Sequence, residues 1–367
     1  MTTNIEQWKE YSAREIATLL PLLERYGFTL EREQPHMGGE RYLMQAITTA
    51  SGKKLILLGK RNSDGKRVVL KATSDPSGIR ELEHERLCRK VLHTIRFAYG
   101  TFTSPEEILF HKKNGFVLSV QAFIEQESTF LQRPLRDQFF LVLKAFKAQE
   151  SAHATTYGHM QTVQKTFGSI DAGTYLQNFS TFKKNILAGA PAQKELSSIL
   201  AKAEDILAAN KKTVAQYEGF LTHTDFVPHN FRISNGSMYL LDYSSLRFGN
   251  KYEGWARFLN FMTLYNPELE KLLTQYVRDN RTPEESVSLH CMRIYRLGEI
   301  IWYYTKTLSQ STGNLLTLNT ERITFWSEVL KAILEEKEVP QGVLEAYKKK
   351  RERLRSEDEK LRQKSLH

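Results

Sequence analysis

The chain has 367 residues, which allows one large two-lobed domain or two ordinary ones. Hydrophobic residues make up 41% and aromatic residues 11%, so a sizeable core is available and global disorder is excluded. The net charge is +10, but part of it lies in the C-terminal stretch and no recognisable nucleic-acid-binding module is present, so we expect no specific nucleic-acid partner.

The cysteine content and the hydropathy of the chain indicate the cellular compartment in which the protein resides. Cys88 and Cys291 are far apart in the sequence, so they form neither a disulfide framework nor a zinc site and suit a reducing compartment. The N-terminus lacks the apolar core of a signal peptide, and no run reaches the roughly 18 apolar residues of a membrane helix. We therefore expect a cytoplasmic protein without a membrane span.

The first elements predicted are a helix and a small sheet. Residues 5–27 have apolar positions at helical spacing and end in Gly27, which predicts one helix, or two helices split near Pro21. Asp64-Gly65 is a strong hairpin signal. Three runs have the composition of antiparallel strands: RYLMQAITTA, KKLILLGK and KRVVLKAT.

A helix and a further strand pair are predicted next. The segment SGIRELEHERLCRKVLHTI has the pattern of a helix, with Ser77 as its expected N-cap. Asn114-Gly115 joins the strands EEILFHKK and FVLSVQAFIE.

From about Arg133 the pattern becomes helical, apart from a β-rich island over residues 220–250 with a tight turn at Asn235-Gly236. The last stretch, YKKKRERLRSEDEKLRQKSLH, is highly charged with almost no apolar face. We interpret it as a solvated helix or a frayed tail.

This order of elements predicts an α+β, two-lobed fold of the protein-kinase-like type: an antiparallel sheet with a helix, then a mainly helical lobe. The expected divisions are an N-terminal helical extension (1–38), an N-lobe that binds nucleotide (39–126), a C-lobe with the catalytic loop and substrate helices (127–340), and a charged helical or disordered tail (341–367).

The most informative motif is HTDFVPHN, followed by LLDYSS. His-x-Asp-x-x-x-x-Asn with a later Asp at a strand end is the catalytic-loop pattern of the kinase fold. In that chemistry one Asp orients the acceptor hydroxyl, while the Asn and the later Asp hold Mg²⁺ on the phosphates of ATP. The pattern assigns the catalytic role to Asp225 and the metal and nucleotide roles to Asn230 and Asp242, with His223 bracing the loop through its ring.

Two charged residues upstream complete the pattern. Lys71 ends the third predicted strand, from which its side chain can reach nucleotide phosphates. The following helix offers Glu81, Glu83 and Glu85 as partners for the lysine, and we favour Glu85 because it shares the side of the helix that turns inward.

In these motifs the chain resembles the aminoglycoside phosphotransferase and choline kinase superfamily, the small-molecule branch of the kinase fold. QESAHATT, with His153, is similar to that family's helix ending in Leu-His, and RFGNKYEGWARF is similar to its Gly-Asp-Pro-x-x-Asp-Leu-Ala segment. The resemblance runs from about residue 40 to 330.

Several departures narrow the class. There is no glycine-rich loop, only a Ser-Gly pair at residues 51–52. Thr224 stands where protein kinases have an arginine, Tyr243 stands where they have the phenylalanine after the metal-binding Asp, and no Ala-Pro-Glu follows. These differences disfavour a typical protein kinase. Gly254 also replaces the second Asp of the family segment.

The resemblance implies an ATP- and Mg²⁺-dependent phosphotransferase acting on a hydroxyl of a small molecule that is aminoglycoside-, choline- or sugar-like. It also implies that adenine binds the backbone near Gln121 and Phe123. The alternative is a kinase-fold binding protein with little or no transfer activity. Acids or an aromatic cage for the acceptor could come from these residues: Glu253, Glu299, Trp255, Trp302, Tyr303 and Tyr304.

Overall fold

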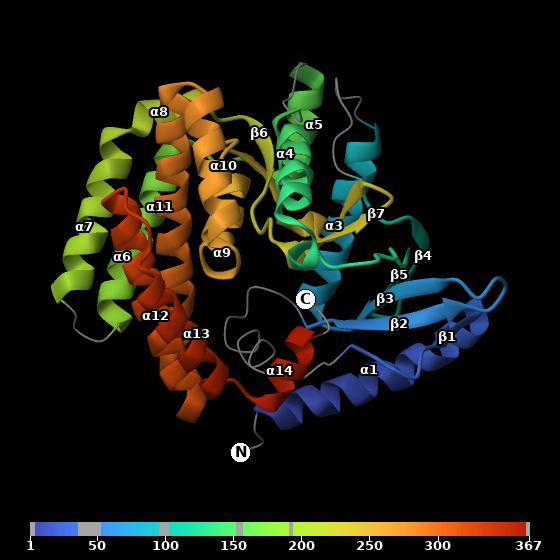
Figure 1. Ribbon diagram of the computed structural model, residues 1–367. Coiled ribbons are helices and arrows are strands. Elements are labelled where there is room, and N and C mark those ends of the chain that lie inside the picture. Colours follow the sequence, from blue (N-terminus) through green and yellow to red (C-terminus); the bar gives the residue numbers. More distant parts are fainter. Residues whose placement is uncertain (1–3, 36–52, 95–102, 152–156, 191–193, 365–367) are drawn as a thin grey trace.

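The N-terminal part of the protein is built on a five-stranded antiparallel sheet (Figure 1). In the computed structural model, which describes residues 4–35, 53–94, 103–151, 157–190 and 194–364, the strand order is β1-β2-β3-β5-β4. The strands are β1 (Phe28–Leu30), β2 (Leu55–Arg61), β3 (Arg67–Thr73), β4 (Glu107–Lys113) and β5 (Phe116–Ala122).

The predicted hairpin turns of this sheet are confirmed. Gly65, between β2 and β3, has a φ of +69°, and Asn114 and Gly115, between β4 and β5, have φ values of +52° and +72°. Positive φ at both central residues is the conformation that Asn-Gly favours in two-residue hairpins.

Helices α1 (Asn4–Tyr26) and α3 (Pro76–Thr94) lie on opposite sides of the sheet (Figure 1). α1 is a single helix despite Pro21, and its Leu19 joins the apolar cluster that contains Leu70 of β3. Because successive side chains of a strand point to opposite faces, the next residue, Lys71, is turned toward α3.

The N-terminal residues take part in this sheet. The sequence pattern predicts no strand at residues 28–30, yet Phe28 pairs with Arg61 and β1 forms the sheet edge beside β2. The predicted strand RYLMQAITTA lies outside the described residues. The domain boundary at residue 38 stays a prediction, but α1 and β1 are packed into the N-terminal lobe.

The start of α3 differs by two residues from the prediction. The helix begins at Pro76, and the carboxylate of Asp75 accepts a hydrogen bond from the backbone N–H of Gly78 at 2.9 Å. Asp75 is therefore the N-cap and Ser77 lies in the first turn, so the predicted cap was wrong. Proline at the first helical position costs nothing because its missing N–H would have no partner there.

The C-terminal part is mainly helical and encloses the larger apolar core. Its helices are α4 (Leu135–Ser151), α5 (Tyr157–Phe167), α6 (Ala172–Gly189), α7 (Lys194–Ala209), α8 (Lys211–Gln216), α9 (Glu253–Tyr265), α10 (Pro267–Asn280), α11 (Pro283–Thr305), α12 (Gly313–Leu334), α13 (Gln341–Leu354) and α14 (Glu357–Lys364). Among the described residues, every helix is too short or too polar to serve as a transmembrane span.

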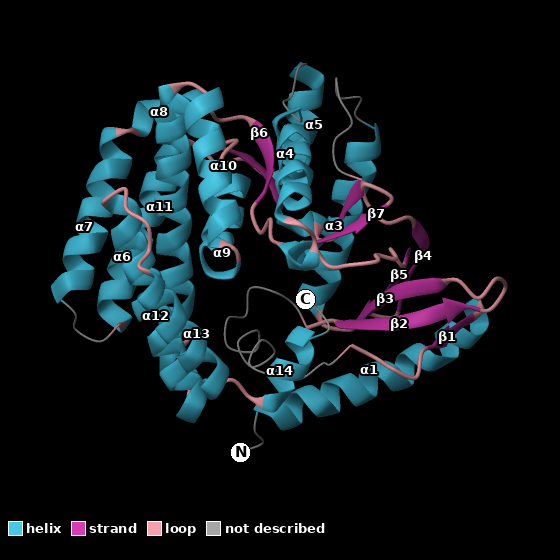
Figure 2. Ribbon diagram, viewed as in Figure 1, coloured by secondary structure: helices cyan, strands magenta, loops and turns pink. Residues whose placement is uncertain are grey.

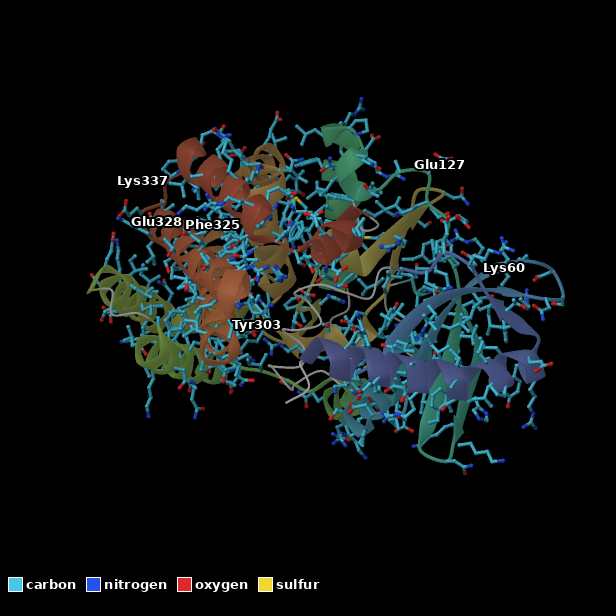
Figure 3. All side chains as sticks on the ribbon, turned by 90° about the horizontal axis from the view of Figure 1, so that it is seen from below. Lys60, Glu127, Tyr303, Phe325, Glu328 and Lys337 are labelled. Atoms are coloured by element: carbon cyan, nitrogen blue, oxygen red, sulfur yellow. The ribbon has the colours of Figure 1, made fainter. Side chains whose placement is uncertain are left out.

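Two short antiparallel strand pairs interrupt these helices, as the β-rich island predicted (Figure 2). They comprise β6 (Phe220–His223), β7 (Phe231–Ser234), β8 (Ser237–Leu240) and β9 (Leu246–Gly249). β6 pairs with β9 and β7 with β8. The fold is thus α+β and two-lobed, as predicted, and Figure 3 shows Lys60 in the sheet lobe and Phe325 in the helical lobe.

Helix α9 lies at the centre of the C-terminal lobe. Between Glu253 and Leu264 every residue is buried except Arg257. A helix that is buried all round has little freedom to shift, so it can hold Arg257 in a defined place.

The C-terminal stretch is helical, as predicted, but it is not a solvated tail. Tyr347 of α13 stacks on Phe325 of α12 with ring centroids 4.0 Å apart, and Leu344 and Leu354 are buried as well. Arg351 covers the ring of Tyr347. The prediction of almost no apolar face was wrong because widely spaced apolar residues fall on one side of the helix.

We predict that Tyr347→Ala lowers the free energy of unfolding by about 3 kcal/mol, because it leaves a cavity against Phe325. Urea unfolding followed by circular dichroism measures the change. The exposed neighbour Lys349 provides the control, since Lys349→Ala should change stability by less than about 0.5 kcal/mol. Equal unfolding midpoints for the two variants would contradict the packing of α13.

Candidate active site

The residues of HTDFVPHN form a loop that presents one carboxylate to solvent. The loop leaves β6 at His223 and enters the short 3₁₀ helix Pro228–Asn230. The amide Nδ2 of Asn230 donates to Oδ2 and to the backbone oxygen of Asp225, both at 2.8 Å. Nε of Arg257 donates to Oδ1 of Asp225 at 2.8 Å. The carboxylate is fixed from two sides, yet 43% of this side chain remains exposed.

The electrostatics keep Asp225 ionised. Burial works to raise the pKa of its carboxyl group, but the charges of Arg257 and Arg296 and the hydrogen bond from Asn230 outweigh it and hold the pKa well below its usual range. At neutral pH Asp225 is therefore a carboxylate that can accept a hydrogen bond.

His223 links the loop to Asp242. Its ring is fully buried, which lowers the pKa of His223 and keeps it neutral at pH 7. Nε2 lies 2.7 Å from the backbone oxygen of Asp242, so Nε2 carries the proton and donates it. The predicted bracing role of His223 agrees with this contact.

Asp242 lies beside the loop with its carboxylate held by two serines. Its oxygens accept hydrogen bonds from Ser244 Oγ at 2.6 Å and from Ser245 Oγ at 2.7 Å. Burial opposes ionisation, but neighbouring charges, that of Lys54 among them, and these hydroxyls lower the pKa of Asp242. The backbone N–H of Leu241 donates to the backbone oxygen of Asn230 at 2.9 Å, which brings the two predicted metal ligands together.

The donor set fits a magnesium ion bound with a nucleotide. Nδ2 of Asn230 donates to Asp225, so its Oδ1 is the atom left to accept or ligate, and Asp242 contributes an ionised carboxylate. Within the described ranges no group of three or more His, Cys, Asp or Glu side chains could hold a metal. Two protein oxygens are enough for Mg²⁺ when phosphates and water complete its shell.

The predicted pair in the N-terminal lobe is formed. Nζ of Lys71 lies 2.6 Å from Oε1 and 2.8 Å from Oε2 of Glu85, and both side chains are almost fully buried. An ammonium group has three donors, so one remains for a ligand. The 3₁₀ helix Tyr243–Ser245 packs against α3, which brings the segment of Asp242 to the helix of Glu85.

A second lysine, which the sequence analysis missed, lies near the same place. Lys54, just before β2, is paired with Glu81. Burial opposes its charge, but Glu81, Glu85 and Asp242 raise the pKa of Lys54 and keep it protonated. The adjacent lysines of KKLILLGK were the available signal, but nothing in the sequence shows which of them points inward.

The connection after β5 offers fewer free groups for binding adenine than the resemblance implies. Gln121 is buried, and its side-chain oxygen, with the amide oriented for best hydrogen bonding, accepts from Arg89. The backbone N–H of Phe123 donates to the backbone oxygen of Arg67 at 3.2 Å, and the ring of Phe123 lies against the guanidinium group of Arg67. A base-binding N–H would have to come from beyond Phe123, and the role of Gln121 and Phe123 stays a prediction.

Gln149 of α4 contacts the start of the loop that carries Asp225. Its Oε1 accepts from the backbone N–H of His223 at 3.3 Å and from Thr222 Oγ1 at 3.4 Å. A Cβ at Gly254 would lie 2.5 Å from this oxygen. An amide from another helix thus supports the loop, a contact between distant segments that sequence spacing does not reveal.

The residues considered for the acceptor differ in their surroundings. Trp255 is buried and stacks on Phe146 with centroids 3.8 Å apart, so it belongs to the core. Glu253 is fully buried and paired with Arg247 and Arg296. Four candidates are partly exposed: Glu299, Trp302, Tyr303 and Tyr304. His153 lies outside the described residues.

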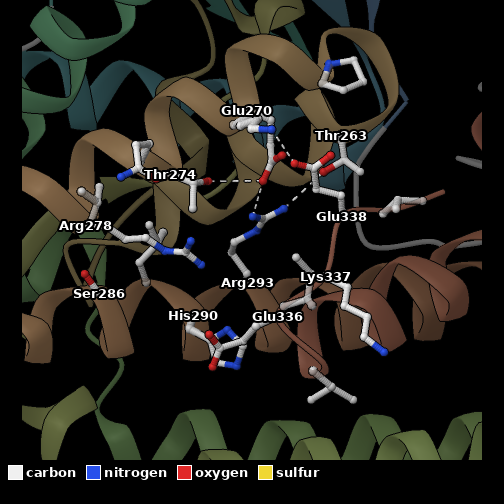
Figure 4. Close-up of a pocket in the computed structure, with 18 of the residues that line it drawn as sticks. Thr263, Glu270, Thr274, Arg278, Ser286, His290, Arg293, Glu336, Lys337 and Glu338 are labelled. Carbon is white, nitrogen blue, oxygen red and sulfur yellow. Dashed lines mark hydrogen bonds and ion pairs between the residues drawn. The ribbon is translucent and has the colours of Figure 1, made fainter. Parts of the chain in front are cut away.

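A separate hollow lies among α10, α11 and the connection after α12 (Figure 4). Arg293 lies at its wall, paired with Glu270 and donating to Asn260 at 3.0 Å. None of the predicted site residues lines this hollow, so it is distinct from the site around Asp225.

The lobes and the site place the chain in the class of kinase-like folds. No sequence model of a protein family matches the chain, and no curated protein sequence matches it. Solved structures of aminoglycoside and macrolide phosphotransferases do share its fold across most of its length.

Three of them illustrate the likeness. Macrolide 2′-phosphotransferase type I matches with a TM-score of 0.57 at 14% identity, covering 84% of this chain and 96% of that chain. The GDP complex of aminoglycoside 2′-phosphotransferase-IIIa matches with a TM-score of 0.55 at 10% identity, covering 87% of this chain and 98% of that chain. A thermostable mutant of aminoglycoside phosphotransferase APH(4)-Ia, in a ternary complex with AMP-PNP and hygromycin B, matches with a TM-score of 0.51 at 14% identity. The match covers 81% of this chain and 97% of that chain. At these identities the likeness is one of fold.

We predict that Arg257→Gln destabilises the protein in a pH-dependent manner. Because the pKa of Asp225 is lowered in the folded state, its stabilising contribution is complete above the unfolded value of about 4 and is lost as the pH falls below it. The difference in unfolding free energy between parent and variant should be constant from pH 7 to about pH 5 and shrink toward pH 3.5.

Urea unfolding at several pH values measures this difference. Arg278→Gln, which changes an exposed arginine of α10, should give no such trend. A loss for Arg257→Gln that is as large at pH 3.5 as at pH 7 would mean that the arginine acts through packing.

We predict that Gly254→Ala costs about 1–3 kcal/mol, because the new methyl group would overlap Gln149 and Thr222. Combining it with Gln149→Ala removes the closest clashing atom, so the double variant should lose less than the sum of the single losses. A double-mutant cycle from urea midpoints tests this. Strict additivity would show that Gln149 does not occupy the space at Gly254.

Proposed function

We propose that the protein is an ATP-dependent phosphotransferase that moves the γ-phosphoryl group to a hydroxyl of a small molecule. The observation that carries the proposal is the ionised, half-exposed carboxylate of Asp225, fixed by Asn230 and Arg257 beside Asp242. The resemblance of HTDFVPHN and LLDYSS to kinase catalytic segments and the shared fold both support it.

The nucleotide would lie between the lysines of the N-terminal lobe and the loop. Lys71, with one donor left by Glu85, and Lys54 offer positive charge to phosphate oxygens. Asn230 and Asp242 would hold Mg²⁺, which when bound supplies positive charge to the phosphates and orients them. The nucleotides bound in two of the matching structures, AMP-PNP and GDP, are consistent with such a site.

Asp225 would receive the acceptor. Its carboxylate accepts a hydrogen bond from the acceptor hydroxyl and so directs the oxygen toward the γ-phosphorus. A bond forms from that oxygen to phosphorus, the bond from phosphorus to the β–γ bridging oxygen breaks, and ADP leaves with the electron pair. The hydroxyl proton passes to Asp225 and then to solvent. A carboxylate of low pKa is a weak base, so orientation is its main contribution.

The alternative is a kinase-fold protein that binds nucleotide without transferring phosphate. Calorimetry with Mg-ATP, followed by a γ-labelled ATP transfer screen against sugars, amino alcohols and antibiotics, distinguishes the two. Binding with transfer supports the proposal, binding with no transfer to any acceptor supports the alternative, and lack of Mg-ATP binding overturns both. We place the activity in the cytoplasm, where ATP is available.

We predict that Asp225→Asn lowers kcat for phosphate transfer by about 10²–10⁴-fold while Mg-ATP binding changes little, because the amide orients the hydroxyl poorly and accepts no proton. Rapid-mixing transfer assays and calorimetry measure the two quantities. Asp205→Asn, an exposed aspartate on α7, is the matched control and should leave kcat unchanged. An Asp225→Asn enzyme with the parent's kcat would refute the catalytic assignment.

A further inference from the structure

The charged residues around Asp225 indicate the charge of the acceptor molecule. This inference rests on the proposed function. Arg296 lies on α11, and its charge acts on Asp225. From Arg296 one side of the helix continues through Glu299 and Tyr303 to Lys306, at spacings of three or four residues. We call Arg296, Glu299, Trp302, Tyr303 and Lys306 the α11 stripe. Figure 3 shows Tyr303 on the side of the helical lobe that faces the sheet lobe.

The acids near this stripe are already neutralised. Glu253 is fully buried and is contacted by Arg247, by Arg296 Nη1 at 3.3 Å and by the hydroxyl of Tyr175 at 2.7 Å. Glu299 lies 2.5 Å from the same guanidinium of Arg296. A polycationic acceptor would need unpaired carboxylates, and these two are occupied by the protein's own arginines.

The aromatic rings of the stripe are also occupied. Nζ of Lys306 lies 4.5 Å from the ring centre of Trp302 and 5.4 Å from that of Tyr303. Trp302 also stacks on Phe182 at a centroid distance of 5.0 Å. A quaternary ammonium group that sought these rings would have to displace a lysine, so an aromatic cage for choline is not formed here.

Positive charge is left over in this region. Each of Asp225, Glu253 and Glu299 is paired with an arginine, whereas Lys306 forms no ion pair with any described residue. Burial lowers the pKa of Lys306, and the charge of Glu299 only partly opposes this effect. The guanidinium Nε of Arg296 is buried and makes no hydrogen bond within the described ranges. An anionic ligand group would pair with the ammonium of Lys306.

We infer that the acceptor is a hydroxylated small molecule carrying an anionic group, a phosphate or a carboxylate, and that the α11 stripe with Arg247 binds this group. Arg247 retains 28% exposure of its side chain and can contact the anion while it holds Glu253. The acceptor hydroxyl would then point to Asp225.

The test uses the full-length protein saturated with Mg-AMP-PNP and four probes that share one sugar ring: glucose, glucosamine, glucuronate and glucose 6-phosphate. Calorimetry should show that an anionic probe binds at least about tenfold more tightly than glucosamine, since a single partly exposed charge contact is worth roughly that factor. Comparison of glucuronate with glucose 6-phosphate distinguishes carboxylate from phosphate. Tightest binding of glucosamine, equal binding of all four, or no binding of either anionic probe would overturn the inference.

Two variants localise the effect. Lys306→Gln and Arg247→Gln should each weaken the anionic probe about tenfold and leave glucose unchanged. Arg278→Gln, on α10, should change neither. Lys306 forms no ion pair with described residues, so its variant should fold even if Arg247→Gln does not. Anion binding that survives Lys306→Gln at full strength contradicts the assignment. Failure of Mg-AMP-PNP to bind at all would instead reject the proposed function.

Discussion

A buried hydrogen bond links the loop of Asp225 to the segment of Asp242. The neutral ring of His223 donates to the backbone oxygen of Asp242, so the loop that carries Asp225 and the segment that carries Asp242 cannot separate without leaving a buried polar group unsatisfied. The pairing of β6 with β9 reinforces the same link from the backbone. The position of each carboxylate therefore depends on the other, although neither touches its counterpart.

Charge is distributed unevenly about this link. On the side of the N-terminal lobe, Lys71 and Lys54 are each paired with a glutamate, and the charge of Lys54 acts on Asp242. On the side of the C-terminal lobe, Arg257 and Arg296 surround Asp225. In the proposed function, phosphate groups would lie between these cationic side chains, where positive charge would face the negative charge that is transferred.

The sequence was informative where one residue type or one short spacing determines the outcome. Both residues of the Asn-Gly turns and the glycine of the Asp-Gly turn adopt positive φ, the conformation these dipeptides favour, so the hairpins were predictable from two residues each. The Lys71–Glu85 pair followed from a strand that ends beside a helix. β1 escaped prediction because three residues are too few to show alternation, and the packed face of α13 was hidden because its apolar residues are few among many charges.

Contacts between segments that are distant in the chain could not be predicted from the sequence pattern. Nothing in RFGNKYEGWARF indicates that Arg257 reaches back to Asp225, since the two are brought together only when α9 is buried in the lobe. The same holds for Lys54, whose partner Glu81 lies on a helix beyond the next strand.

Gly254 and Gln149 are sterically coupled. A Cβ at Gly254 would lie 2.5 Å from Oε1 of Gln149, the atom that accepts a hydrogen bond from the backbone N–H of His223. A side chain at Gly254 would therefore displace the amide and remove its support from the loop that carries Asp225. A substitution at one of the two positions requires a matching change at the other, so the pair restricts which sequences can keep this loop in place although the two residues are distant in the chain.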